Sequence, residues 1–86
     1  MRLIRVLGPD CPQACELAEN ARQAVRELGL EADIERVTDM DVITLYAVMA
    51  TPALVVDGRV QAAGRVLPAE EIRKLLAGPG QFSLLP

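Results

Sequence analysis

The strongest constraint on the fold is an apolar stripe at helical spacing near the N-terminus. Its members fall about one helical turn apart: Ala14, Leu17, Ala18, Ala21, Ala24, Val25 and Leu28. This spacing places them on one face of an α-helix, and that face must be buried against another layer of structure. Pro12 suits the first helical turn, and Gly29 suits the position just past the last one. The sequence therefore predicts a long helix with one buried face.

Short β-rich segments surround this helix. Strands are predicted over 3–7, 33–37, 53–56 and 59–63. The charges of the second strand favour an edge position, and the unbroken apolar run of the third predicts burial on both faces. Asp57-Gly58 is a typical two-residue hairpin turn, so the last two strands are expected to be antiparallel.

Two shorter helices complete the predicted order. Thr38 is the expected cap of the first, whose apolar face is predicted to comprise Val42, Leu45, Tyr46 and Met49. Pro68 opens the second, in which Ile72, Leu75 and Leu76 share a face. The order β-α-β-α-β-β-α predicts an α/β fold, with a mixed four-stranded sheet in strand order 2-1-3-4 and helices on both faces. We expect one domain over 1–77 and a short tail over 78–86.

Composition excludes several kinds of chemistry. The 86 residues include two cysteines and no histidine, so a Ser-His-Asp triad, a Cys-His pair and a closed four-ligand zinc site from one chain are ruled out. The net charge of −3 argues against nucleic acid as a partner. The apolar runs are too short to span a membrane, and the N-terminus lacks the pattern of a signal peptide. We therefore expect a cytoplasmic protein with no membrane partner.

Cys11 and Cys15 fall at the junction between the first strand and the long helix. The helix start offers unpaired backbone N–H groups and the positive end of the helix dipole, which favour a thiolate at Cys11 and make it the expected nucleophile. Residues four apart in a helix have Cα atoms roughly 6.2 Å apart, inside the disulfide window of about 4.4–6.8 Å. A Cys11–Cys15 disulfide is therefore feasible, although both residues could instead be small buried hydrophobes.

Several motifs together resemble the thioredoxin superfamily, and in particular its small glutaredoxin-like redox-active disulfide proteins. They are the turn Gly8-Pro9-Asp10-Cys11-Pro12, the amphipathic helix, and Thr51-Pro52 before a buried strand and hairpin. The resemblance extends from Met1 to about Ala77. It implies a thioredoxin-like fold and a Cys11–Cys15 redox disulfide with no other cofactor. It also implies a cis bond before Pro52, with Thr51 and Pro52 beside Cys11 to bind an extended substrate, and protein disulfides and an upstream reductase as partners.

One departure from the family motif is clear. The family has Cys-Pro-x-Cys, whereas here Ala14 occupies the usual second position and the cysteine is at 15. One residue further along a helix rotates a side chain by about 100°, so Cys15 should lie at the flank of the buried stripe and be less buried than the usual second cysteine of the family. Asp10 either caps the helix or accepts a proton from Cys15. Tyr46 either approaches the thiols or packs in the core.

Three functions are compatible with these residues. The first is a thiol–disulfide oxidoreductase or electron carrier that uses the Cys11/Cys15 pair. The second is a thiolate site for a soft metal or metalloid, to which a homodimer would bring four thiolates, although no metal site is predicted within a single chain. The third is an inactive thioredoxin-like scaffold for protein contacts. We expect a monomer, with a dimer as the alternative.

Overall fold

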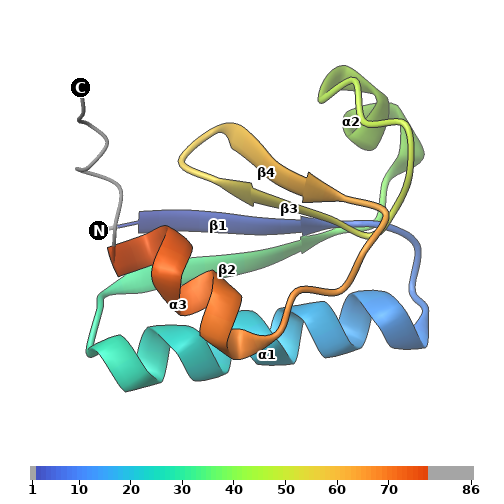
Figure 1. Cartoon of the computed structure of the whole chain (residues 1–86). Coiled ribbons are helices and arrows are strands. Elements are labelled where there is room, and N and C mark those ends of the chain that lie inside the picture. The colour runs from blue at the N-terminus through green and yellow to red at the C-terminus, as the bar shows by residue number, and fades with distance from the viewer. Residues whose placement is uncertain (1, 78–86) are drawn as a thin grey trace, which may run out of the picture.

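The computed structural model describes residues 2–77 as an α/β fold (Figure 1). The elements are β1 (Arg2–Leu7), α1 (Pro12–Leu28), β2 (Ala32–Val37), α2 (Met40–Leu45), β3 (Ala53–Val56), β4 (Arg59–Ala63) and α3 (Ala69–Ala77). This order is the predicted one. The tail predicted over 78–86 lies outside the described residues.

The four strands form one mixed sheet in the order β2-β1-β3-β4, as predicted. β1 and β2 are parallel, whereas β3 is antiparallel to both β1 and β4. Helices α1 and α3 lie on one face of the sheet, and α2 lies on the other side, near the end of β1 (Figure 1). The expected edge position of β2 and the placement of helices on both faces are therefore confirmed.

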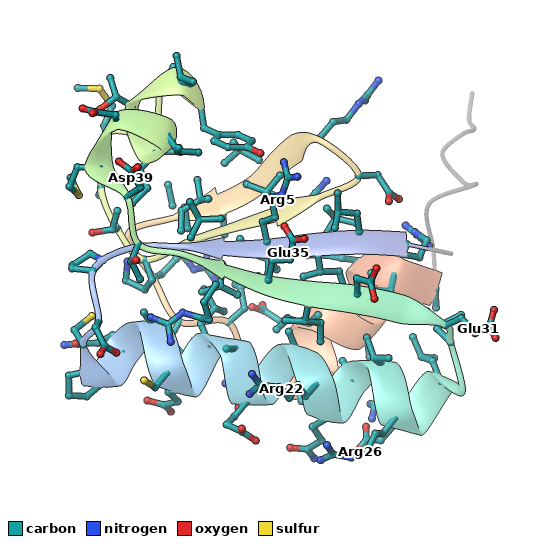
Figure 2. All side chains as sticks on the ribbon, turned by 180° about the vertical axis from the view of Figure 1, so that it is seen from behind. Arg5, Arg22, Arg26, Glu31, Glu35 and Asp39 are labelled. Atoms are coloured by element: carbon teal, nitrogen blue, oxygen red, sulfur yellow. The ribbon has the colours of Figure 1, made fainter. Side chains whose placement is uncertain are left out.

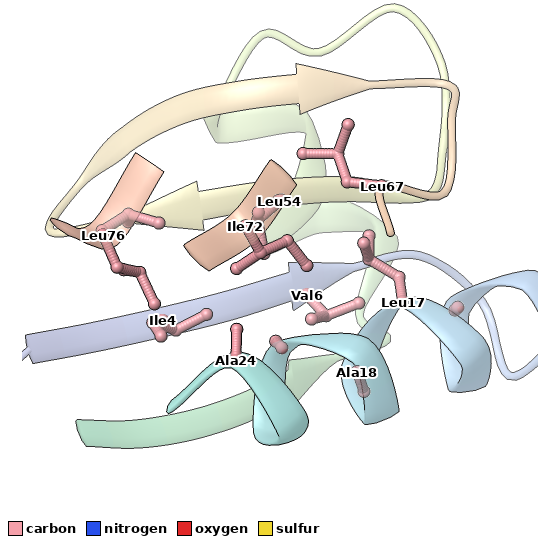
Figure 3. Packing of buried hydrophobic residues seen from close by; sticks show 12 residues of the cluster. Ile4, Val6, Leu17, Ala18, Ala24, Leu54, Leu67, Ile72 and Leu76 are labelled. Carbon is pink, nitrogen blue, oxygen red and sulfur yellow. The ribbon is translucent and has the colours of Figure 1, made fainter. Parts of the chain in front are cut away.

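The main core lies between the sheet and the helices α1 and α3 (Figure 3). Ile4 and Val6 of β1 face the stripe of α1, and Ile72 of α3 closes the cluster from the side. All of the stripe's alanines and Leu17 are buried. Because alanine is small, helix α1 can approach the sheet closely.

A smaller cluster on the opposite face contains Leu7, Ile43, Ala53 and Val55. Helix α2 covers this cluster, and Ile43 is its one buried residue. The predicted apolar face of α2 is therefore wrong for Val42, Leu45 and Met49, which are exposed, whereas Tyr46 does pack against this cluster. The helix ends at Leu45, which is 83% exposed, and Met49 lies beyond it at 96% exposure.

The predicted cap of α2 is also wrong by one residue. Asp39, not Thr38, is the N-cap, and its carboxylate accepts a hydrogen bond from the backbone N–H of Asp41 at 2.9 Å. An aspartate at this position accepts an otherwise unpaired N–H and also interacts favourably with the helix dipole.

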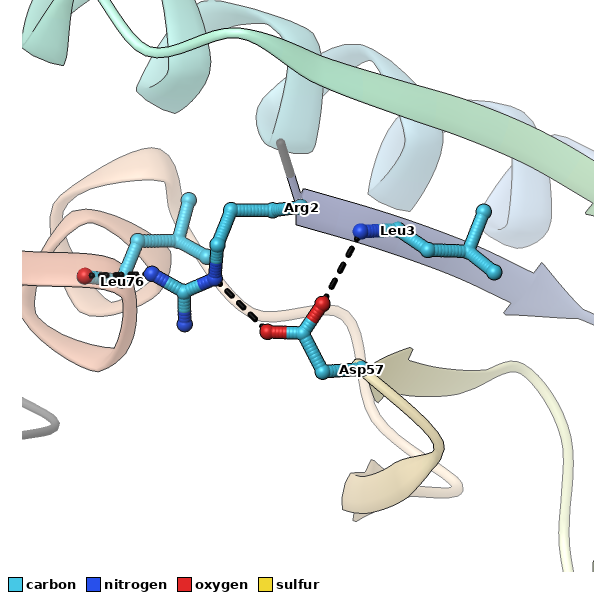
Figure 4. A network of polar contacts seen from close by, with 4 residues as sticks. All are labelled: Arg2, Leu3, Asp57 and Leu76. Carbon is cyan, nitrogen blue, oxygen red and sulfur yellow. Dashed lines mark hydrogen bonds and ion pairs between the residues drawn. The ribbon is translucent and has the colours of Figure 1, made fainter.

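The hairpin turn between β3 and β4 is tied to the rest of the fold by one carboxylate (Figure 4). Asp57 accepts a hydrogen bond from the Leu3 backbone N–H at 3.0 Å and another from Arg2 Nε at 2.7 Å. The same Arg2 donates through Nη1 to the Leu76 carbonyl at 3.2 Å. Three elements distant in sequence, β1, the hairpin and α3, are thereby joined.

We expect Asp57→Asn to destabilise the protein at neutral pH by up to about 1 kcal/mol, since the group is largely exposed. The backbone hydrogen bond from Leu3, and then the Arg2 guanidinium, lower the pKa of Asp57. A carboxyl with a lowered folded pKa stabilises the fold above its unfolded pKa of about 3.9, and this contribution is lost as the pH falls through the folded value. Urea unfolding at neutral pH and at about pH 3 measures the difference, which should shrink in acid.

Asp33→Asn, at an exposed carboxylate on β2, is the matched control. An Asp57→Asn deficit that is the same at both pH values would contradict the proposed role of the charge.

Candidate active site

The turn after β1 places both cysteines at the start of α1. Cys11 is the N-cap residue, with extended backbone angles (φ −138°, ψ 163°), and Pro12 occupies the first helical position as predicted. The backbone N–H of Cys15 donates to the Cys11 carbonyl at 3.1 Å, which closes the first helical turn. The two residues are thus joined by one turn of helix, and both are free thiols within the described chain.

The two thiols differ in exposure. Cys11 is half-buried and packs against the main core, whereas Cys15 is exposed. Ala14, which the resemblance places at the second cysteine position of the family motif, is fully buried in the stripe. The expected place of Cys15 at the flank of the stripe is therefore confirmed.

An arginine from the edge strand lies against the Cys15 thiol. Arg36 of β2 donates through Nη1 to Cys15 Sγ at 3.5 Å, and through Nη2 to the Pro9 carbonyl at 3.5 Å. Its Nε is buried and has no hydrogen-bond partner among residues 2–77. The guanidinium therefore lies between the edge of the sheet and the turn that carries the cysteines.

Sequence reasoning missed this contact, although a signal was present. Arg36 alternates with Ala32 and Ile34 along β2, and both of these pack against the main core under α1. The parallel register pairs Arg36 with Val6, close to the end of β1. A side chain on this face at this end of β2 points to the start of α1.

Asp10 contacts the same thiol. The Cys15 thiol donates to Asp10 Oδ1 across a long 3.9 Å contact. The interpretation of Asp10 as a helix cap is wrong, because the N-cap is Cys11 and no side chain in the described residues makes the capping hydrogen bond. The Cys15 sulfur therefore contacts both a carboxylate and a guanidinium.

The Thr51-Pro52 loop lies against the same turn. The peptide bond between these residues is cis, as the resemblance implied. A Cβ atom added at Gly8 would lie 3.4 Å from Thr51 Cβ, 3.5 Å from Pro52 Cα and 3.7 Å from Ala14 Cβ. The structure therefore brings the loop, the turn before Cys11 and the start of α1 together.

Tyr46 does not take part in this arrangement. It is half-buried against the smaller cluster on the far face of the sheet, and its hydroxyl accepts a hydrogen bond from Arg5. Arg5 also pairs with Glu35 at 3.1 Å, and Figure 2 shows both side chains on that face. The hydrogen bonds to Tyr46 and then to Glu35 raise the pKa of Arg5. Of the two roles considered for Tyr46, the structure shows packing.

Residues 2–77 contain no group of three or more His, Cys, Asp or Glu side chains placed to hold a metal ion. None of the helices in this part of the chain is long and apolar enough to cross a membrane.

Known proteins resemble this chain to different degrees. Residues 2–77 match the family model described as a thioredoxin domain. A thioredoxin from Methanothermobacter thermautotrophicus is 42% identical over 77 residues, which covers 90% of this chain and 100% of that protein. A thioredoxin from Methanocaldococcus jannaschii is 37% identical over 76 residues, covering 88% and 87%. A Nu-class GST from Haemonchus contortus aligns at a TM-score of 0.47 and 24% identity, over 92% of this chain and 36% of the other.

Proposed function

Because the chain belongs to the thioredoxin domain family, we propose that Cys11 and Cys15 form a reversible dithiol–disulfide pair that reduces protein disulfides. Membership of the family makes the chain a thioredoxin-like redox protein. The observation that carries the finer proposal is the position of both thiols in one helical turn, at the start of α1. That spacing is compatible with a disulfide inside the turn.

The surroundings of the pair support this chemistry. The Thr51-Pro52 loop lies against the turn that leads into Cys11, where an extended substrate strand would meet the thiols. Thiol–disulfide exchange needs no cofactor beyond the two sulfurs, because the disulfide itself carries the two electrons. Under this proposal, an upstream reductase restores the dithiol in the cytoplasm, where thiols are kept reduced.

The test is catalysed reduction of insulin disulfides by the purified protein with dithiothreitol as the electron source. We expect the wild-type protein to accelerate the reaction, and Cys11→Ser and Cys15→Ser each to lower the rate at least about a hundredfold, because a single thiol cannot complete the exchange. Thiol titration and intact mass should show both thiols lost and two hydrogen atoms removed on oxidation.

The Cys11→Ser/Cys15→Ser double variant, checked for folding by circular dichroism, is the control for loss of structure. A single-cysteine variant that keeps the full insulin-reduction rate would refute the dithiol mechanism.

A further inference from the structure

We propose that a groove between helix α1 and the free edge of β2 binds an extended acidic segment of the proteins with which the thiols exchange. The inference rests on the proposed dithiol function and names the chemistry by which a partner would be recognised. Three features carry it: the lining of the groove, the unpaired edge of β2, and the position of the groove beside the cysteine turn.

The groove has a basic wall and an apolar floor. Its volume is about 350 Å³, and it is lined by Arg22, Val25, Arg26, Ala32 and Ile34. The three apolar residues are half-buried against the main core, so their outer surfaces form an aliphatic floor. Both arginines are exposed on the flank of α1 (Figure 2). A ligand that carries both carboxylates and aliphatic side chains would complement this lining.

The positive charge along this groove is only partly balanced by neighbouring acids. Arg22 pairs with Glu19 at 2.6 Å, but Arg26 makes no ion pair among residues 2–77. Arg36 follows Ile34 on the same face of β2, and its buried Nε has no partner in this part of the chain. The whole chain has a net charge of −3, so this cluster of arginines is a local exception. It would attract an acidic partner and repel a basic one.

The edge of β2 adds a row of backbone hydrogen-bonding groups. β2 is the outer strand of the sheet and pairs with β1 on one side, and no other strand within residues 2–77 pairs with its second edge. An extended segment can join such an edge through main-chain hydrogen bonds, while its alternate side chains point to the same face. One set of these side chains would then lie over the groove, beside Ile34 and the arginines of α1.

A second copy of this chain is a poor occupant of the same edge. The other face of β2 carries Asp33 and Glu35, which are both exposed. If two copies paired β2 with β2 about a twofold axis, these carboxylates would lie opposite one another, which is destabilising. The occupant is therefore a segment of another protein, with acidic and aliphatic side chains on the face toward α1.

The groove leads to the cysteine turn. Cys15, Arg22 and Arg26 are spaced by about two turns and one turn of α1, so they share one flank of the helix. At the end of β2, Arg36 donates to Cys15 Sγ at 3.5 Å and to the Pro9 carbonyl at 3.5 Å. A segment bound along β2 would therefore run toward the thiols and bring a nearby disulfide of the same partner within their reach.

The binding test uses the Cys11→Ser/Cys15→Ser variant, so that disulfide chemistry does not contribute. The probe is a fluorescein-labelled peptide that repeats Glu-Thr-Leu-Thr, which in a strand places glutamate and leucine on one face and threonine on the other. Fluorescence anisotropy should show binding that weakens by roughly five- to tenfold when Arg22→Gln and Arg26→Gln are added, since two exposed charge contacts are lost. Replacing glutamate by glutamine or lysine in the peptide should also weaken binding.

Arg59→Gln/Arg65→Gln is the matched control, because it removes the same charge at the opposite edge of the sheet, where Arg65 pairs with Glu71 at 3.2 Å. It should change the affinity by less than about twofold. Amide NMR shifts should change along β2 and not along β4. Equal weakening by both double variants, or tighter binding of the lysine peptide or of single-stranded DNA, would overturn the inference.

A redox assay separates this inference from the proposed function. The protein with both cysteines is given the same peptide ending in a cysteine that is disulfide-linked to mercaptoethanol, with dithiothreitol as the electron source. Arg22→Gln/Arg26→Gln should raise KM by the factor found for binding and leave kcat unchanged. Reduction of dithiodipyridine, which is too small to span the groove, should not change. An unchanged KM for the peptide would overturn the inference alone, whereas failure of the wild-type protein to reduce insulin would overturn the function.

Discussion

Leu17→Ala is expected to lower the free energy of unfolding by about 3 kcal/mol. Leu17 is the largest of the buried side chains of α1, is 0% exposed, and belongs to the main core, where it lies near Val6 (Figure 3). Its removal leaves a cavity among close-packed aliphatic side chains that have no aromatic neighbour large enough to fill it. In a domain of this size, that loss is a large part of the total stability.

Leu45→Ala is the matched control, because it removes the same atoms from a side chain that is 83% exposed. This control variant should change stability by less than about 0.5 kcal/mol. Urea unfolding followed by circular dichroism gives both values. Equal losses in the two variants would show that α1 does not pack against the sheet as described.

The fold was predictable where a repeating pattern extends over enough residues to identify a helix or strand and the face that it buries. The stripe from Ala14 to Leu28 covers more than four helical turns and predicted both α1 and its buried face. Asp57 and Gly58 both adopt positive φ in the structure, as the predicted hairpin turn requires. The unbroken apolar run over 53–56 identified a strand that is indeed buried along its whole length.

Helix α2 shows where such patterns stop being informative. It has 6 residues, fewer than two turns, so the apolar residues around it can be assigned to several alternative faces. The structure buries Ile43 and leaves Leu45 in solvent, because the contact with Leu7 and Val55 decides the orientation. That choice is made by tertiary packing and cannot be read from so short a segment.

The candidate site likewise has residues that the sequence could identify and one that it could not. The cysteines and the Thr51-Pro52 loop have local motifs, so the resemblance was enough to single them out. Arg36 belongs to no motif, and it is 21 residues from Cys15 in sequence. Only the parallel register of β1 and β2 brings its guanidinium to the thiol. A side chain that comes to a site through sheet pairing is found only once the register is known.

The loop that carries Thr51 is held by a backbone hydrogen bond from Gly64. Gly64 follows β4, has φ +78°, and donates its N–H to the Pro52 carbonyl at 2.8 Å. A Cβ atom at this position would lie 2.9 Å from Ala50 Cβ. An alanine here would therefore meet both an unfavourable backbone conformation and a steric clash.

Gly64→Ala is accordingly expected to lower the free energy of unfolding by about 2–3 kcal/mol. It should also lower the rate of insulin reduction, because the 50–52 loop beside the cysteine turn must shift to make room for the added Cβ. Gly29→Ala is the matched control, with φ +66° but no atom within 4 Å of the added Cβ. It should cost only about 1 kcal/mol, the part due to backbone conformation, and leave the activity unchanged. Chemical denaturation and the insulin assay on both variants separate the two contributions. If Gly64→Ala and Gly29→Ala behave alike, the contact with Ala50 has no role in holding Thr51 against the cysteine turn.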